Sequence, residues 1–204
     1  MTSALAKYIS AFFHPIIYPT LSVLLYFVTI PKYFSIQIRL SILIITFVGT
    51  VVIPVFLLAL LKYNGLIDSY SIPKAVGRRF PFLIIIIIAL LMGRLFFRMQ
   101  VTADFGYYFV SGALALSICY IFLWWGVKLS VHTMSLGSVL GFFMFLSVYY
   151  QLNFLLLFAL FFLMFGVIAR ARLVLKAHTI SELLWGFFLG TTTQLLLPLL
   201  LQKI

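Results

Sequence analysis

Long apolar stretches alternate with short polar segments along the whole chain. A helix rises about 1.5 Å per residue, so roughly 20 apolar residues cross the ~30 Å hydrocarbon core of a bilayer. Seven stretches approach that length, although 82–97 and 154–168 are short for full spans. The pattern predicts an all-α, polytopic integral membrane helical bundle with six or seven transmembrane helices. The predicted spans are 12–30, 40–61, 82–97, 106–127, 131–149, 154–168 and 180–201.

The first apolar stretch does not have the form of a cleavable signal peptide. It contains Pro15 and Pro19, and it is followed by Pro31 and Lys32 instead of a small-residue cleavage site. No internal repeat, low-complexity tract or long linker divides the chain. We therefore expect one transmembrane domain over residues 1–204.

Composition excludes a water-soluble protein. Of the 204 residues, 65% are hydrophobic and 8% are charged, whereas soluble domains have about 25% charged residues. So few charges cannot cover a water-exposed surface, and so much apolar content also excludes a disordered chain. The single cysteine, Cys119, lies in an apolar run and offers no disulfide framework.

The net charge of +11 has two readings. In a soluble protein it would suggest a nucleic-acid partner. Here most Lys and Arg flank apolar spans, where they face anionic lipid head groups. We therefore expect membrane lipids, and no nucleic acid, as partners.

The polar segments alternate between the two faces of the bilayer, because each span carries the chain across. Face A is defined by the N-terminus and segments 62–81, 128–130 and 170–179, and face B by 31–39, 98–105, 151–153 and the C-terminus. Nine of the fourteen Lys and Arg belong to face A, which the positive-inside rule would place in the cytoplasm. Three of those nine, Lys74, Arg79 and Arg172, have a chemical role described below. Without them, six Lys and Arg belong to face A and five to face B. The orientation therefore stays open.

Three clusters on face A carry ionisable side chains. Such groups are costly near the hydrocarbon core, so their presence predicts a functional site. The clusters are 74–81 (KAVGRRFP), 128–132 (KLSVH) and 170–182 (RARLVLKAHTISE).

The third cluster has the most informative spacing. His178 and Glu182 are four residues apart, so on a helix they would share one face. A carboxylate on one imidazole nitrogen fixes the tautomer and makes the other nitrogen a better nucleophile or base. Arg172 could present its planar fork of donors to an oxyanion.

The second cluster offers complementary chemistry. The Ser130 hydroxyl can donate to an anion, and a protonated His132 can give a proton to a leaving group. Phosphoryl transfer is catalysed mainly by positioning and charge neutralisation. The three clusters together therefore favour chemistry on a phosphate group.

These motifs resemble those of the type 2 phosphatidic acid phosphatase (PAP2) family, the membrane relatives of vanadium haloperoxidases. Its motifs are written K-x6-R-P, P-S-G-H and S-R-x5-H-x3-D. The third is similar to the run from Ala171 to Glu182, the second to Leu129-Ser130-Val131-His132, and the first, loosely, to Lys74 through Pro81. The resemblance covers residues 74–190.

The chain departs from that pattern at several positions. Alanine replaces the serine at Ala171 and Glu182 replaces the aspartate, while Leu129 and Val131 replace the proline and glycine of the second motif. The cation spacing of the first motif is compressed. Two apolar runs also separate the first and second motifs, although parity returns all three to face A.

The resemblance implies roles for eight residues. His178 would be the nucleophile that forms a phosphohistidine, His132 the general acid and Glu182 the partner of His178. The implied phosphate ligands are Lys74, Arg79, Ser130 and Arg172, and Arg78 could replace Arg79. The implied activity is hydrolysis of a phosphomonoester or diphosphate on an isoprenoid or glycerolipid carrier, in the bacterial cytoplasmic membrane. No cofactor is implied, and the few Cys, Glu and His residues do not suggest a metal site. Substrate identity and oligomeric state stay open.

Other readings compete with this one. The same residues could bind or transport a lipid phosphate without cleaving it, or transfer the phosphoryl group to an acceptor other than water. Singly, basic residues such as Lys128, Arg170 and Lys176 are typical interface anchors. We also expect a structural role, and no catalytic one, for His14. Arg94, Arg98 and Asp104 are expected to be snorkelling or paired residues. The pairs Gly137–Gly141 and Gly186–Gly190 are expected to allow close helix packing.

Overall fold

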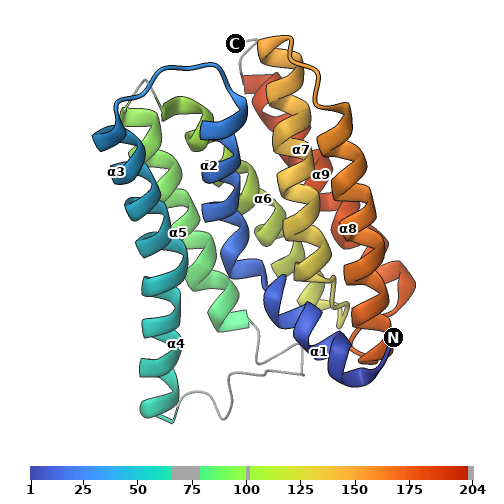
Figure 1. Cartoon of the computed structure of the whole chain (residues 1–204). Coiled ribbons are helices and arrows are strands. Elements are labelled where there is room, and N and C mark those ends of the chain that lie inside the picture. Colours follow the sequence, from blue (N-terminus) through green and yellow to red (C-terminus); the bar gives the residue numbers. More distant parts are fainter. Residues whose placement is uncertain (66–78, 100–101, 202–204) are drawn as a thin grey trace. The chain divides into compact units, whose positions relative to one another are not determined.

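The computed structural model describes residues 1–65, 79–99 and 102–201. Every regular element in these ranges is helical, and none is a strand. Within them, seven helical segments are long and apolar enough to cross a membrane (Figure 1). The predicted all-α polytopic membrane protein is thereby confirmed, with seven candidate spans among the described residues.

The two spans that looked short are full-length helices. Helix α5 covers Arg79–Arg98 and α8 covers Leu155–Val174, so Arg94, Arg98, Arg170 and Arg172 lie inside helices. The predicted spans 82–97 and 154–168 were too narrow partly because they ended shortly before Arg98 and Arg170. Long arginine side chains can keep an apolar stem against the helix while the charge reaches a polar region.

The first predicted span is interrupted. Helix α1 (Ser3–Phe12) ends before His14, the short 3₁₀ helix η1 covers Pro15–Ile17, and α2 covers Tyr18–Thr29. Pro15 lacks an N–H group, so it suits the first position of a new helix rather than the interior of an old one. The break gives the chain a separate N-terminal helix that the apolar pattern alone did not predict.

The chain forms two compact units. Unit 1 contains residues 1–18 and 128–204, with α1, η1, α7 (Val131–Tyr150), α8 and α9 (Ile180–Leu201). Unit 2 contains residues 19–127, with α3 (Ile36–Phe47), the π-helix η2 (Val48–Val52), α4 (Ile53–Tyr63), α5 and α6 (Ala103–Trp124), and nearly all of α2. The single domain over 1–204 stays a prediction.

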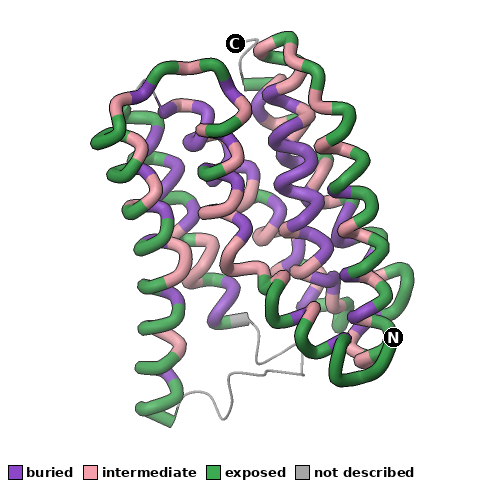
Figure 2. The backbone as a smooth tube through the Cα atoms, in the orientation of Figure 1, coloured by how far each residue is buried: buried purple, intermediate pink, exposed green. Residues whose placement is uncertain are grey.

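Helix α7 is the most buried helix of unit 1 (Figure 2). It packs against α9 through glycines on both helices. A Cβ atom on Gly137 or Gly141 would collide with the carbonyl of Phe187 or Thr191, and one on Gly190 with the carbonyl of Met134. The predicted role of these glycines in close helix packing is confirmed.

Unit 2 is held by polar and apolar contacts. The Tyr26 hydroxyl donates to Asp104 Oδ2 at 2.5 Å, and Lys32 Nζ lies 3.5 Å from the same oxygen. Asp104 is therefore a paired residue, as expected.

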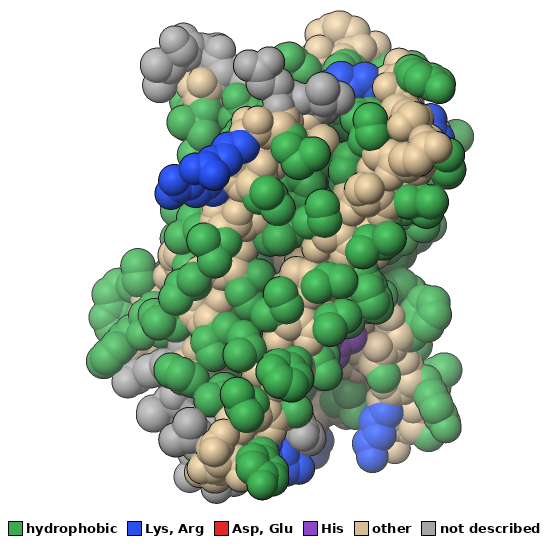
Figure 3. Space-filling view, turned by 90° about the vertical axis from the view of Figure 1, so that its left-hand side faces the viewer, with side chains coloured by type: hydrophobic (Ala, Val, Ile, Leu, Met, Phe, Trp, Pro, Cys, Tyr) green, Lys and Arg blue, Asp and Glu red, His purple; other side chains and the backbone are tan. Residues whose placement is uncertain are grey.

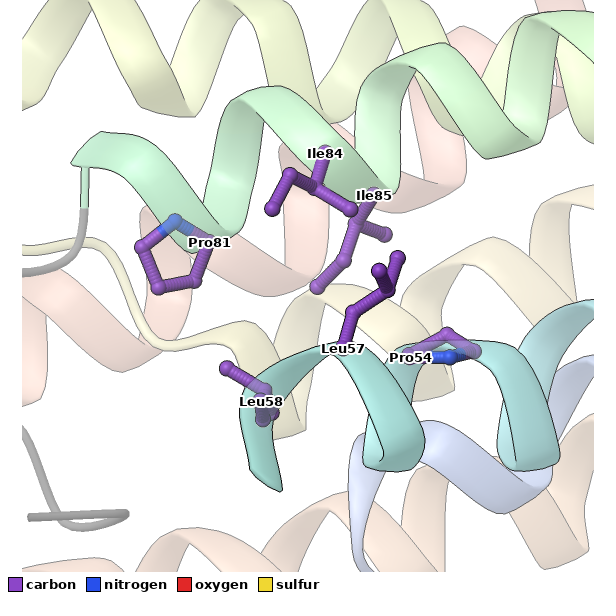
Figure 4. A pocket seen from close by; sticks show the side chains of 6 residues that line it. All are labelled: Pro54, Leu57, Leu58, Pro81, Ile84 and Ile85. Carbon is purple, nitrogen blue, oxygen red and sulfur yellow. The ribbon is translucent and has the colours of Figure 1, made fainter. Parts of the chain in front are cut away.

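Between α4 and α5, a crevice of about 10 Å³ is lined by six apolar side chains and offers no catalytic group (Figure 4).

The surface matches a lipid environment. Figure 3 shows a face covered largely by hydrophobic side chains, with Lys and Arg towards its two ends and no Asp or Glu among the described residues in view. Large exposed side chains such as Leu156, Phe56 and Ile44 would be costly in water, and they are favourable against lipid.

Candidate functional site

The second and third motifs meet in unit 1, where α8 ends and α7 and α9 begin (Figure 1). Helix α8 ends in a Schellman-type turn: Ala177 N–H donates to Arg172 O and Lys176 N–H to Leu173 O. Lys176 takes the left-handed conformation that this turn requires, with φ of 51°. The turn reverses the chain and places His178 just before α9.

His178 is held at one ring nitrogen by two acceptors. Its Nδ1 lies 2.9 Å from Glu182 Oε2 and 3.1 Å from the main-chain carbonyl of Lys128. Both partners accept and cannot donate when Glu182 is ionised, so Nδ1 carries the proton and the ring lone pair is on Nε2. The side chain is only 2% exposed.

The predicted contact between His178 and Glu182 is present, but its geometric basis differs. His178 precedes α9, so the two residues do not share a helical face. They meet through a capping box: Thr179 N–H donates to Glu182 Oε2 at 3.1 Å, and Glu182 N–H donates to Thr179 Oγ1 at 3.3 Å. The T-x-x-E sequence of 179–182 carries this signal, which the sequence analysis missed.

Ser130 joins the second motif to the third. Its main-chain N–H donates to Glu182 O at 3.1 Å, and its hydroxyl accepts from Thr133 N–H at 3.5 Å as the N-cap of α7. The residue is fully buried. Its predicted role as a phosphate ligand stays a prediction, and its observed role is to cap α7.

His132 and Arg172 meet at a residue that the sequence analysis did not single out. Arg172 Nη1 donates to the Ser10 hydroxyl at 2.7 Å. His132 Nε2 lies 3.1 Å from the Ser10 carbonyl and 3.3 Å from its hydroxyl. Ser10 is far from both residues in sequence, so no local spacing could have indicated this contact.

His14 also lies beside His132. The two rings are edge to face, with centroids 5.7 Å apart. His14 Nδ1 accepts from Ile16 N–H at 3.4 Å and caps η1, which agrees with the structural role expected for it. The contact between His14 and His132 was not predicted from the sequence.

The first motif lies largely outside the described residues. Lys74 and Arg78 lie outside the described residues, and Arg79 is described only as the first residue of α5. Their assignment as phosphate ligands stays a prediction.

The described site combines two oriented imidazoles, one carboxylate and one guanidinium. Such groups could supply a nucleophile, an acid and anion donors to a bound phosphate. Among the described residues, no three His, Cys, Asp or Glu side chains converge as a metal-ligand set.

Comparisons of the chain with protein-family models, with curated proteins and with solved structures find no match.

Proposed function

We propose that this membrane protein is a lipid phosphatase that works through a phosphohistidine on His178. The observation that carries the proposal is the pairing of His178 Nδ1 with Glu182 Oε2 and the Lys128 carbonyl. That pairing puts the ring lone pair on Nε2, where it can attack phosphorus. The resemblance of 171–182 to the third PAP2 motif supports the same role.

The proposed reaction has two steps. His178 Nε2 forms a bond to phosphorus while the bond from phosphorus to the leaving oxygen breaks, and protonated His132 gives its proton to that oxygen. Water then attacks phosphorus and the P–N bond breaks, while the now neutral His132 takes a proton from that water and returns to its protonated form as inorganic phosphate is released. Glu182 stabilises the positive charge that the His178 ring acquires in the first step.

Arg172 would neutralise the phosphate in both steps. Its guanidinium is always charged and matches phosphate oxygens with parallel donors. Because His178 is nearly buried, substrate entry has to open contacts around the ring. Once bound beside this buried ring, the phosphate would be shielded from water, and the shielding would strengthen its interactions with the charged groups.

The proposed substrate is a phosphomonoester or diphosphate of an isoprenoid or glycerolipid. The candidate site lies at the ends of apolar helices, so a lipid tail could remain in the membrane while its head group reaches the site. From the resemblance we further propose the bacterial cytoplasmic membrane as the location.

Phosphate release by the purified protein in detergent tests the proposal, with a panel of lipid phosphates as substrates. The matched variant is His178→Asn, because the Asn amide can still donate to Glu182 and Lys128 but has no counterpart of Nε2. We expect release by the wild type, none by the variant, and an acid-labile phosphohistidine at position 178 in the wild type alone.

Other results would contradict the proposal. Release at the wild-type rate by His178→Asn would exclude the nucleophile. Tight binding of a lipid phosphate without release would favour a carrier, and phosphorylation of an added alcohol in place of water would favour a phosphotransferase.

A further inference from the structure

Helix α1 contributes a buried hydroxyl to the candidate site. Ser10 is 7% exposed, although Leu5, Tyr8 and Phe12 on the same helix are exposed. Its hydroxyl lies 2.7 Å from Arg172 Nη1, and its carbonyl lies 3.1 Å from His132 Nε2. One residue of the N-terminal helix therefore contacts both of the groups proposed to handle the phosphate and the leaving oxygen.

The donors and acceptors of Ser10, Arg172 and His132 define what each contact does. Arginine has donors only, so the Ser10 hydroxyl accepts from Arg172 and keeps its own proton for another acceptor. His132 Nε2 lies 3.1 Å from the Ser10 carbonyl and 3.3 Å from the Ser10 hydroxyl. Because the carbonyl is an acceptor only and is the nearer of the two oxygens, we assign the His132 proton to Nε2. The proton that protonated His132 can give away is then the one on Nδ1.

The two imidazoles are thus held in complementary ways. His178 is held at Nδ1 by Glu182 and the Lys128 carbonyl, which directs Nε2 to chemistry. His132 is held at Nε2 by Ser10, which directs Nδ1 to chemistry. An imidazole fixed at one nitrogen presents the other in one orientation.

We infer that Ser10 is a positioning residue of the phosphate site: its hydroxyl holds the Arg172 guanidinium and its carbonyl holds His132 with the proton on Nε2. This inference rests on the proposed function for the identity of the anion. It extends the site to α1, outside residues 74–190 that carry the family resemblance.

Ser10→Ala tests the hydroxyl, and Ser3→Ala is the matched control, since it is the same change at an exposed position of the same helix. The readouts are the affinity for inorganic phosphate, measured by calorimetry in detergent, and the kcat and KM for lipid phosphate. A hydrogen bond to a charged group is worth about a tenfold effect or more. We expect Ser10→Ala to weaken phosphate binding and raise KM about tenfold, with a smaller change in kcat, and Ser3→Ala to match the wild type.

A double-mutant cycle with Arg172→Ala separates positioning from general packing. If the hydroxyl acts through Arg172, Ser10→Ala has little further effect on phosphate affinity once Arg172 is removed. In the protein that keeps Arg172, Ser10→Thr retains a hydroxyl and should bind phosphate more tightly than Ser10→Ala. Nitrogen NMR of ¹⁵N-histidine-labelled protein should show neutral His132 with its proton on Nε2. Thermal unfolding of each variant identifies any loss that comes from misfolding.

The outcomes distinguish this inference from the proposed function. Unchanged phosphate affinity and KM in Ser10→Ala, fully additive effects with Arg172→Ala, or a His132 proton on Nδ1 would overturn it. Failure of the wild type to bind inorganic phosphate would overturn it as well. Weaker phosphate binding by Ser10→Ala in a protein that releases no phosphate from any lipid would support Ser10 and reject the phosphatase.

Discussion

The main-chain N–H of Ser130 donates a 3.1 Å hydrogen bond to the main-chain carbonyl of Glu182. This bond joins the segment before α7 to the first turn of α9, 52 positions apart in the numbering. The Lys128 carbonyl contacts His178 Nδ1 from the same segment. Two motifs that are distant in sequence are therefore joined by one bond between backbone atoms and by one contact between a backbone carbonyl and the His178 ring.

Glu182 has two roles, and substitutions can separate them. Glu182→Gln keeps an oxygen for the Thr179 N–H and for His178 Nδ1–H, so the cap of α9 should survive. It removes the negative charge that would stabilise the ring during phosphoryl transfer. We expect kcat to fall at least about tenfold, with little change in KM or unfolding temperature, measured by phosphate release and thermal unfolding in detergent.

Thr179→Ala is the complementary control. It removes the hydroxyl that accepts from Glu182 N–H, and loss of such a cap costs about 1 kcal/mol. We expect a lower unfolding temperature with a near-normal turnover per folded molecule. A wild-type kcat in Glu182→Gln would show that the charge of Glu182 has no part in turnover.

His132 can be tested by the need of the leaving group for a proton. His132→Gln retains an N–H donor for the Ser10 carbonyl, but an amide cannot transfer a proton. We expect hydrolysis of a lipid phosphomonoester, which expels an alkoxide, to slow about 100-fold. Hydrolysis of p-nitrophenyl phosphate, whose leaving group is stable without a proton, should change much less.

His14→Asn is the control for this comparison. Its side-chain oxygen can still accept from Ile16 N–H, so η1 keeps its cap. The ratio of the two rates should equal that of the wild type. An equal slowing of both substrates in His132→Gln would indicate a role in binding and contradict the general acid.

Much of the fold could be predicted from the sequence, because a helix that crosses the bilayer needs about 20 apolar residues. The spans 131–149 and 180–201 agree closely with α7 and α9, since their ends are marked by polar residues. The spans 82–97 and 154–168 ended too early, shortly before Arg98 and Arg170, because a hydropathy pattern treats an arginine as a stop although its stem can continue the helix. The break after Phe12 also escaped, since the apolar character continues through it.

The candidate site could be predicted only where the contacting residues are close in sequence. His178 and Glu182 are close in sequence, so spacing alone predicted their contact. Ser10 contacts Arg172 across 162 positions, and such a contact depends on how α1 packs against α8 rather than on any local pattern. Ser130 was expected to face an anion, and its hydroxyl instead caps α7, because a serine directly before a helix is also a favoured N-cap.

The α7–α9 contact predicts a sharp difference between two glycines. A Cβ on Gly190 would meet the Met134 carbonyl and Ser138, which are backbone and side-chain atoms of a buried helix. Overpacking of this kind costs about 1–3 kcal/mol, so Gly190→Ala should lower the unfolding temperature. Gly166 has no atom within 4 Å of its Cβ position, and Gly166→Ala should leave stability unchanged or raise it by up to about 1 kcal/mol. Equal behaviour of the two variants in thermal unfolding would contradict the close packing of α7 and α9.

The Tyr26–Asp104 pair predicts a stability effect separate from catalysis. Tyr26→Phe removes the hydroxyl that donates to a buried carboxylate at 2.5 Å, and leaving a buried acceptor short of a donor costs about 1–3 kcal/mol. Tyr33→Phe is the matched control, because Tyr33 is 89% exposed. We expect Tyr26→Phe alone to lower the unfolding temperature, while both variants release phosphate at the wild-type rate per folded molecule. Reduced release by folded Tyr26→Phe protein would show that Asp104 contributes to function, since neither residue belongs to the site assigned to His178 and His132.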